Sequence, residues 1–208
     1  DLLEDYADYV TIGTIGDMVP LLNENRAIVK AGLKLINTDA KIGISALKKS
    51  TNSKAEHFSA TDVAFQICPR INAAGRMDTA NLAVDLLTCE DNEIAEYKAE
   101  QLNLENTHRH EVEEKIDKDI AEIMANDRAY QTDRVIVVAG HNYHKGVIGI
   151  CAAHLVELYS KPAIVIGIDD EGNATGSARS IDGFNIFEAI SSCSDILTHF
   201  GGHPLAAG

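Results

Sequence analysis

The chain has 208 residues and a mass of 22.5 kDa, with 45% apolar and 24% charged positions. This composition can supply one sizeable hydrophobic core or two small ones, and it argues against a disordered chain. Apolar runs such as residues 135–139 and 163–168 are far shorter than the roughly 18 residues of a membrane span. We therefore expect a soluble protein that does not contact a membrane.

The charge is concentrated in one part of the chain. There are 32 acidic and 18 basic residues, and the formal net charge of -14 argues against broad electrostatic attachment to nucleic acid. Residues 89–133 contain 14 of the acids and only 5 of the bases. The remaining segments are closer to neutral and leave room for a local anion-binding groove.

The N-terminal residues and the cysteines indicate the origin and environment of the chain. DLLEDYADYV has neither an initiating methionine nor a basic segment leading into an apolar one, so we expect a segment of a longer protein without a signal peptide. The four cysteines form no C-x-x-C pair and are too sparse for a disulfide scaffold. We expect a reduced, cytoplasmic environment.

The first 90 residues predict one strand and several helices. A β-branched run at 9–15 predicts a strand, and residues 25–35, 42–49 and 81–87 have helical spacing. The predicted strand ends at Gly16, which places Asp17 where a carboxylate can reach a metal or a substrate. A solvated loop aspartate or a helix cap is the simpler alternative.

Residues 69–76 (PRINAAGR) place two arginines around small residues. Close approach of the backbone would let the guanidinium groups of Arg70 and Arg76 bind an anion. Surface ion pairs with Asp78 and Asp85 explain the same composition equally well.

A long helix is predicted from residue 93 to residue 124, where glycine and proline are absent. At 1.5 Å per residue it would be about 45–50 Å long, which exceeds one small domain and indicates a connector between two. A coiled-coil partner is the alternative, and the lack of sustained heptads disfavours it. The apolar stripe consists of Ile94, Tyr97, Leu104, His108, Val112, Ile116, Ile120 and Ile123.

An α/β pattern follows the long helix. Residues 134–139 predict a buried strand, 146–159 a helix, 163–168 a second strand, and 169–173 a turn into a third strand that continues through Ala178. The strand–helix–strand order predicts a parallel pair with a right-handed crossover.

The turn at 140–149 (GHNYHKGVIG) joins a predicted strand to a predicted helix. Backbone N–H groups at a helix start attract anions, and Gly146 and Gly149 allow close approach. Lys145 could add positive charge. Metal binding by His141 and His144 ranks below hydrogen bonding, because no third ligand is near in the sequence.

Residues 176–180 (GSARS) form an extended segment in which Ser177 and Arg179 face the same side. A hydroxyl and a guanidinium on one face suit two phosphate oxygens. The alternative is an edge strand with a solvated arginine.

The final segment, 201–208 (GGHPLAAG), predicts a helix that starts at Pro204. Gly202 and His203 would then lie at its positive end, where the imidazole can donate to an anion. A structural histidine is the alternative. The glycines and the proline exclude a helical metal pair of His199 and His203.

Taken together and in this order, GTIGDMVPL, PRINAAGR, HKGVIGI, GSARS and GGHPLAAG resemble the RecJ branch of the DHH phosphoesterase superfamily. The resemblance implies an α/β protein in which 1–90 is the C-terminal piece of a DHH catalytic domain. Residues 91–128 would be a long acidic connector helix, and 129–208 a DHHA1 domain that is incomplete at its C-terminus. It also implies 5′ to 3′ exonuclease action on single-stranded DNA in repair and recombination, with Mn²⁺ or Mg²⁺ as cofactor.

The same resemblance assigns roles to individual residues. It makes Asp17 a catalytic ligand of the metal pair. It places a further set near the DNA strand and its scissile phosphate, namely Arg70, Asn72, Arg76, His144, Lys145, Gly146, Ser177, Arg179, Gly202 and His203.

The chain departs from the family pattern because the DHH triplet and the upstream D-x-D motif are absent from these 208 residues, as is the OB-fold segment. One aspartate cannot hold two metal ions, so we expect this chain alone to have no nuclease activity. The alternatives are a DHH phosphodiesterase for nanoRNA or cyclic dinucleotides, and a catalytically silent RecJ-like replication factor that binds nucleic acid.

Overall fold

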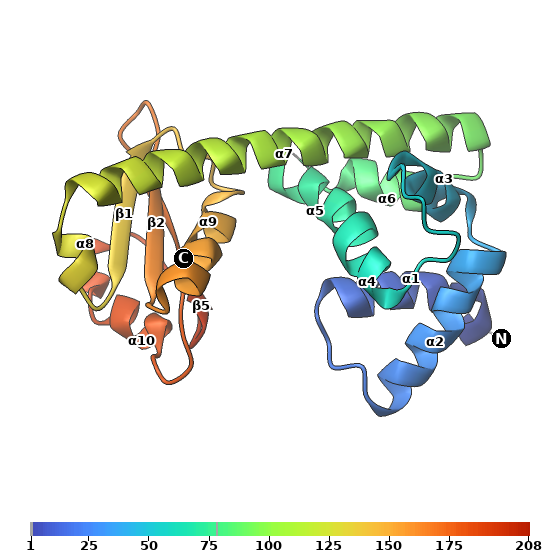
Figure 1. Ribbon diagram of the computed structural model, residues 1–208, viewed down its shortest axis with the longest axis horizontal. Coiled ribbons are helices and arrows are strands. Elements are labelled where there is room, and N and C mark those ends of the chain that lie inside the picture. The colour runs from blue at the N-terminus through green and yellow to red at the C-terminus, as the bar shows by residue number, and fades with distance from the viewer. Residues whose placement is uncertain (1, 78) are drawn as a thin grey trace. The chain divides into compact units, whose positions relative to one another are not determined.

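The computed structural model describes residues 2–77 and 79–208, with side chains from residue 5 onward except at 78 and 131 (Figure 1). The chain divides into two compact units, of which unit 1 ends at His108 and unit 2 begins at Arg109. Within the described residues, no helix has the length and apolar character needed to cross a membrane.

All the regular elements of unit 1 in its described residues are helices. The helices predicted at 25–35 and 42–49 are confirmed with slightly longer bounds, and the helix predicted at 81–87 is confirmed with the same bounds. A π-helix, η1, separates α4 from α5. The helices of unit 1 that precede the long helix are α1 (Leu2–Gly16), α2 (Asn23–Thr38), α3 (Ile42–Ser50), α4 (Ala60–Asp62), η1 (Val63–Ile67), α5 (Cys68–Met77) and α6 (Asn81–Leu87).

The strand predicted at 9–15 is wrong, because these residues lie within α1. β-Branched residues lower helix propensity by less than about 1 kcal/mol each, and burial of the helix face outweighs that cost. Ile12 and Ile15 enter the core of unit 1, while Thr11 is fully buried and donates from Oγ1 to the Ile28 carbonyl at 3.4 Å. Asp17 consequently follows a helix end and not a strand end.

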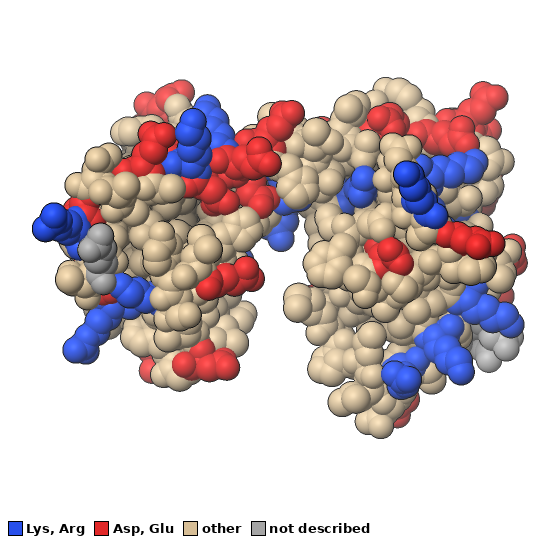
Figure 2. Space-filling view, in the orientation of Figure 1, with Lys and Arg blue, Asp and Glu red and all other residues tan. Residues whose placement is uncertain are grey.

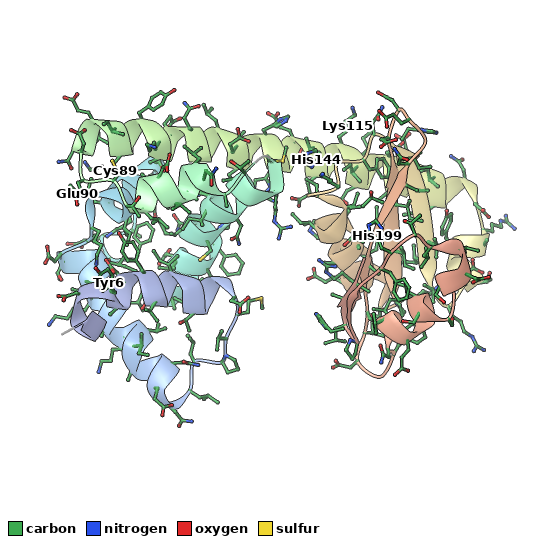
Figure 3. All side chains as sticks on the ribbon, turned by 180° about the vertical axis from the view of Figure 1, so that it is seen from behind. Tyr6, Cys89, Glu90, Lys115, His144 and His199 are labelled. Atoms are coloured by element: carbon green, nitrogen blue, oxygen red, sulfur yellow. The ribbon has the colours of Figure 1, made fainter. Side chains whose placement is uncertain are left out.

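An ion pair with a buried carboxylate holds the middle of α1. The Asp8 side chain has no exposed surface, and its Oδ1 lies 2.8 Å from Nζ of Lys41. The same ammonium group lies 4.7 Å from the ring centroid of Tyr9 and 5.3 Å from that of Tyr6, which is marked in Figure 3. Charge pairing and cation–π attraction therefore hold the start of α3 against α1.

The long helix is confirmed as α7 (Asn92–Asn126), which has 35 residues and carries many of the acidic side chains (Figure 2). Its first half buries a different face from the predicted one. Ile94, Tyr97 and Leu104 are exposed, and Ala95, Ala99 and Leu102 are buried instead. Small alanines allow α7 to approach the helices of unit 1 closely, which a search for large apolar residues does not detect. In the second half the predicted Ile116 and Ile120 are buried.

Unit 2 contains a five-stranded sheet with the order β1-β2-β3-β5-β4. β1 (Ile136–His141) and β2 (Ala163–Ile168) are parallel, as predicted, and α9 (Ile148–Tyr159) connects them. β3 (Ala174–Arg179) pairs antiparallel with β2 on one side and with β5 (Ala206–Ala207) on the other, so its C-terminal end is not an edge. The predicted α/β fold with a long helix is confirmed. The remaining short elements are α8 (Ala129–Thr132), α10 (Ile186–Ser191) and the 3-10 helix η2 (Ser194–Ile196).

The helix predicted at Pro204 is wrong. Gly202–His203 is the strand β4, which pairs antiparallel with β5, and Pro204 lies in the turn between them. The backbone of Gly202 has φ +153°, and a Cβ there would lie 2.4 Å from the Ala206 carbonyl oxygen. Pairing of β5 with β3 outweighs the local helix-start signal of proline, because it satisfies backbone groups that a short helix would leave open.

We predict that Gly32→Ala destabilises unit 1 strongly. A Cβ at this position would lie 2.1 Å from both the Ala7 carbonyl oxygen and Oγ1 of Thr11, so α1 and α2 would have to separate. The expected loss in unfolding free energy is at least about 2 kcal/mol, measured by chemical denaturation.

Gly13→Ala is the matched control, since a Cβ at this exposed helical position meets nothing within 4 Å. It should leave stability unchanged or raise it by up to about 1 kcal/mol. Equal denaturation midpoints for the two variants would contradict the close contact of α1 with α2.

Candidate metal pocket and phosphate-binding turn

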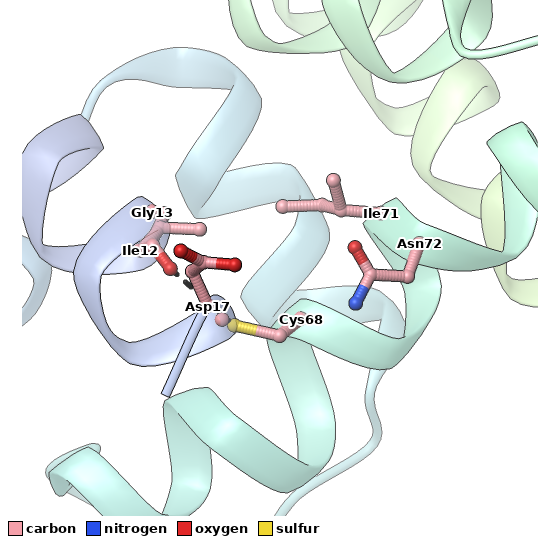
Figure 4. Close-up of a pocket in the computed structure, with 7 residues that line it drawn as sticks. Ile12, Gly13, Asp17, Cys68, Ile71 and Asn72 are labelled. Atoms are coloured by element: carbon pink, nitrogen blue, oxygen red, sulfur yellow. Dashed lines mark hydrogen bonds between the residues drawn. The ribbon is translucent and has the colours of Figure 1, made fainter. Parts of the chain in front are cut away.

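A pocket of about 240 Å³ in unit 1 contains Asp17 and Asn72. The end of α1 supplies one wall and α5 supplies the other (Figure 4). The structure therefore brings two of the predicted site residues together from segments 55 positions apart. The lining residues are Ile12, Gly13, Gly16, Asp17, Cys68, Ile71 and Asn72.

A Schellman motif at the end of α1 sets the position of Asp17. Val19 N donates to the Thr14 carbonyl and Met18 N to the Ile15 carbonyl, both at 3.1 Å. Met18 has φ +56°, a left-handed conformation that a non-glycine residue adopts at a cost of about 1 kcal/mol. The Asp17 carboxylate thus lies at the negative end of the α1 dipole, an environment that favours a bound cation.

Cys68 contributes a buried thiol to one wall of this pocket. Its Sγ donates to the Ile12 carbonyl at 3.6 Å. Burial raises the pKa of the Cys68 thiol to about 11. The pocket therefore offers oxygen donors, from the Asp17 carboxylate and the Asn72 amide, which are the ligand types that Mg²⁺ and Mn²⁺ prefer.

The two arginines of PRINAAGR have different surroundings, because 69–76 lies within α5 and not in an open loop. Arg70 donates from Nη1 to the Gln66 carbonyl at 2.7 Å and from Nε to Oδ1 of Asn103 at 3.0 Å. Burial lowers the Arg70 pKa, against an opposing effect of Glu100. Arg70 joins α5 to α7 and does not line the pocket. Arg76 is exposed in the last turn of α5.

Of the two ion-pair partners that the sequence suggested for these arginines, the structure describes only Asp85. Asp85 pairs with Lys98 at 2.9 Å, whereas Asp78 lies outside the described residues. The small residues Ala73 and Ala74 are buried in the helix packing of unit 1. They therefore serve the core and do not form a cradle for an anion.

In unit 2 the side chains of Arg179 and Ser177 lie directly over the first turn of α9. A Cβ at Gly149 would be 2.9 Å from both Nη2 of Arg179 and Oγ of Ser177. Arg179 Nη1 donates to Ser177 Oγ at 3.2 Å and to the Ala178 carbonyl at 2.8 Å, so the two side chains share one face of β3, as their alternation predicts. A guanidinium, a hydroxyl and a helix start therefore meet at one place.

His203 lies on the same face of the sheet as Arg179. Ala206 of β5 pairs with Arg179 on one side and with His203 on the other. Residues directly opposite one another in antiparallel strands point to the same face, and two strand spacings separate His203 from Arg179 by about 10 Å. His203 thus shares a sheet face with Arg179 through strand register, and it lies in a strand and not at a helix start. Gly202 forms the exposed backbone beside it.

The turn before α9 carries the remaining predicted residues. Nδ1 of His144, which is marked in Figure 3, accepts from Gly146 N at 3.2 Å. In the neutral imidazole the proton is then on Nε2, which is the donor. Nδ1 of His203 similarly accepts from Leu205 N at 3.3 Å, so its Nε2 also carries the proton. Lys145 is exposed in the turn.

One cluster of titratable residues in unit 2 has no counterpart among the sequence predictions. His154 of α9 lies between two carboxylates of α7, with Nδ1 2.8 Å from Asp117 and Nε2 3.5 Å from Glu113. The three could offer ligand atoms to a metal ion. However, Arg109 pairs with Glu113 and the Cys151 thiol donates to Asp117, so existing contacts account for the cluster. In the sequence, the i, i+4 spacing of Glu113 and Asp117 could have indicated this cluster. The third member, His154, lies 37 positions after Asp117, so spacing alone does not reveal it.

A comparison with protein families defines the class of unit 2. Residues 132–208 match the model of the DHHA1 domain. The five-stranded sheet, α9 and the site formed by Ser177, Arg179 and His203 all lie within this match. Unit 2 therefore contains a DHHA1 domain.

The whole chain resembles one group of proteins with this domain. It is 43% identical over 209 residues to the single-stranded-DNA-specific exonuclease RecJ of Bacillus subtilis, covering 100% of this chain and 26% of that protein. It is 35% identical to RecJ of Haemophilus influenzae, covering 98% of this chain and 37% of the relative. RecJ of Thermus thermophilus in complex with Mn²⁺ has a TM-score of 0.86 and 34% identity, covering 99% of this chain and 30% of that one. The chain belongs to the RecJ family and spans about a quarter to two fifths of these relatives.

We predict that the cysteines differ widely in reactivity. At pH 8 a thiol with a pKa of about 11 is ionised in roughly one molecule per thousand, and Cys68 is also buried. Burial, reinforced by Asp117, raises the pKa of Cys151 as well. Cys193 is exposed. Alkylation with iodoacetamide, followed by mass spectrometry, should modify Cys193 first and leave Cys68 and Cys151 unmodified.

Unfolding the chain in guanidinium should make all four cysteines react, which controls for intrinsic differences. Labelling of Cys68 in the folded chain at the rate of Cys193 would contradict the buried thiol wall of the Asp17 pocket.

Proposed function

We propose that the chain is part of a metal-dependent exonuclease that hydrolyses single-stranded DNA from 5′ to 3′ in repair and recombination. The relatives named as single-stranded-DNA-specific exonucleases support this assignment. The single structural observation that supports it best is the approach of Arg179 and Ser177 to Gly149. It supports a local anion site, in our proposal, within a chain that is otherwise strongly acidic.

In this proposal unit 2 binds the sugar-phosphate backbone. Arg179 supplies charge-assisted hydrogen bonds, and the helix start and the Ser177 hydroxyl add neutral ones. His203 and His144 present Nε2–H donors beside them. Lys145 and Gly146 of the turn and Gly202 of the hairpin complete the set. Proteins hold single strands with a local positively charged groove and with aromatic stacking. Because only 5% of the residues are aromatic, we propose that phosphate contacts provide most of the binding here.

Unit 1 is proposed to supply one ligand, Asp17, to a site for Mn²⁺ or Mg²⁺. RecJ structures solved with Mn²⁺ and with Mg²⁺ support this choice of ions. A bound metal ion would activate a water molecule for attack on phosphorus. The Asp17 pocket fits only part of such a site, because a single carboxylate cannot hold two ions. Asn72 is proposed to orient water or substrate in the pocket, and Arg70 and Arg76 to form the wall beyond it.

The domain boundaries are likewise a proposal. We assign residues 1–90 to the C-terminal part of a DHH catalytic domain, 91–128 to the connector and 129–208 to DHHA1. The four cysteines, all within the described residues, are free, which supports a reducing cytoplasmic location.

Arg179→Ala should weaken binding of a short 5′-phosphorylated oligonucleotide about 10- to 100-fold, because charge-assisted hydrogen bonds contribute about 1.5–3 kcal/mol. Fluorescence titration at fixed salt measures the effect, and a melting curve checks that the variant remains folded. Arg134→Ala is the matched control, since it removes an equal charge from an exposed position of unit 2. Equal affinities of the Arg179 and Arg134 variants would count against the site.

The 208-residue chain with Mn²⁺ should release no nucleotides from a 5′-phosphorylated single strand, because its ligand set is incomplete. In a longer protein that contains the DHH and D-x-D motifs, Asp17→Ala should lower the rate at least about 100-fold. If the 208-residue chain does degrade the strand and Asp17→Ala abolishes that activity, the residues of this chain are sufficient for hydrolysis and the prediction is wrong. Comparing rates on long strands and on dinucleotides separates the exonuclease from a nanoRNA or cyclic-dinucleotide phosphodiesterase, and binding without hydrolysis by the longer protein would indicate a silent factor.

A further inference from the structure

Two glycines on neighbouring strands make a notch in the sheet of unit 2. Gly140 of β1 and Gly167 of β2 are in-register partners of the parallel pair. A Cβ at Gly140 would lie 2.0 Å from Cζ of Tyr143, and a Cβ at Gly167 would lie 2.4 Å from the Tyr143 carbonyl oxygen. The notch therefore accommodates Tyr143 only because both positions lack side chains, and Tyr143 is 8% exposed.

The backbone directs Tyr143 into this notch. Asn142 has φ +58°, a left-handed conformation that asparagine tolerates better than most residues. It is held by donation from its backbone N to the Ile168 carbonyl at 2.8 Å and from Nδ2 to Asp170 at 3.1 Å. The next residue, His144, accepts from Val147 N and Ile148 N and so begins the first turn of α9.

The Tyr143 hydroxyl makes a contact that packing alone does not need. It donates to Oδ2 of Asp119, which belongs to α7. Burial, then the hydrogen bond and charge of Asp119, raise the Tyr143 pKa, so the phenol stays protonated as a donor at neutral pH. A phenyl ring would fill the notch equally well, but it would not connect the turn to α7.

We propose that Tyr143 is a positioning residue for phosphate binding. Its ring in the notch and its bond to Asp119 fix the turn at 144–149, and thereby hold the first turn of α9 beneath Arg179 and Ser177. Tyr143 itself touches no phosphate in this scheme. The inference rests on the proposed function of unit 2, and it adds the element that sets the geometry of the site.

The test uses Tyr143→Phe in the 208-residue chain, with Tyr159→Phe as matched control because Tyr159 is 47% exposed and distant from the turn in sequence. Tyr143→Phe should weaken binding of a 5′-phosphorylated 12-nucleotide oligodeoxythymidine about 2- to 10-fold, since one net hydrogen bond is lost. Hydrogen–deuterium exchange at residues 144–149 should become faster by a similar factor. Tyr159→Phe should change neither quantity.

Asp119→Ala should reproduce both effects, and the double variant Tyr143→Phe with Asp119→Ala should add nothing further, because the two side chains form one hydrogen bond. Additive losses would overturn the assigned bond as the origin of the effect.

Three outcomes distinguish this inference from the proposed function. Unchanged exchange at 144–149 in Tyr143→Phe would overturn the positioning role whatever the affinity. If Tyr143→Phe lowers the melting temperature but leaves the affinity unchanged, while Arg179→Ala lowers the affinity, Tyr143 contributes only to stability. The proposed phosphate site would then still be supported. Failure of the wild-type chain to bind the oligonucleotide would overturn the proposed phosphate site and, with it, the role of Tyr143 in binding.

Discussion

The missing side chain at position 149 is the constraint on which the site in unit 2 depends. Arg179 and Ser177 approach the first turn of α9 to within 2.9 Å of where a Cβ would be. A bare backbone at this position lets a guanidinium, a hydroxyl and a helix start lie next to one another. The sheet extends the same face to His203 through the pairing of β3, β5 and β4. The remainder of unit 2 holds these few groups at fixed spacing.

The acidity of the chain is compatible with such a site because the charges are segregated. Many of the carboxylates lie on α7, and some of them are used internally. Glu113 pairs with Arg109, Asp117 with His154, and Asp119 accepts from Tyr143. The Glu113–Arg109 pair lies within α7, and the other two contacts join the second half of α7 to α9 and to the turn before it. Partial burial makes such pairs costly to break, since removing one partner leaves the other charge desolvated.

Much of the fold could be predicted from the sequence where local pattern and tertiary environment agree. The strands β1 and β2 and the helix α9 of unit 2 follow from buried apolar runs between turn residues, and the shared face of Ser177 and Arg179 follows from strand alternation. α7 was predictable from its length without glycine or proline. For the candidate site, the residues within each segment could therefore be predicted from the sequence, but the contacts between the segments could not.

The errors arise where distant packing decides the outcome. The run at 9–15 is helical in a packing where Gly32 of α2 lets the α1 backbone come close. This contact joins residues far apart in the sequence, so a local sequence pattern does not predict it. Pro204 lies in a hairpin because β5 pairs with β3, and the buried face of α7 in unit 1 is lined with alanine because the neighbouring helices are close. The pairing of His154 with Glu113 and Asp117 likewise depends on the packing of α9 against α7.

The proposed anion site contains few cationic side chains, and their number determines how strongly the binding of a single strand would depend on salt. Each phosphate neutralised by a cationic side chain releases condensed counterions, and for single strands affinity falls with salt in proportion to the number of such contacts. With Arg179 as the principal cation over the turn, that number is small. Under the proposed function, the contribution of this site to binding a single strand would depend only weakly on ionic strength and would extend over a few nucleotides.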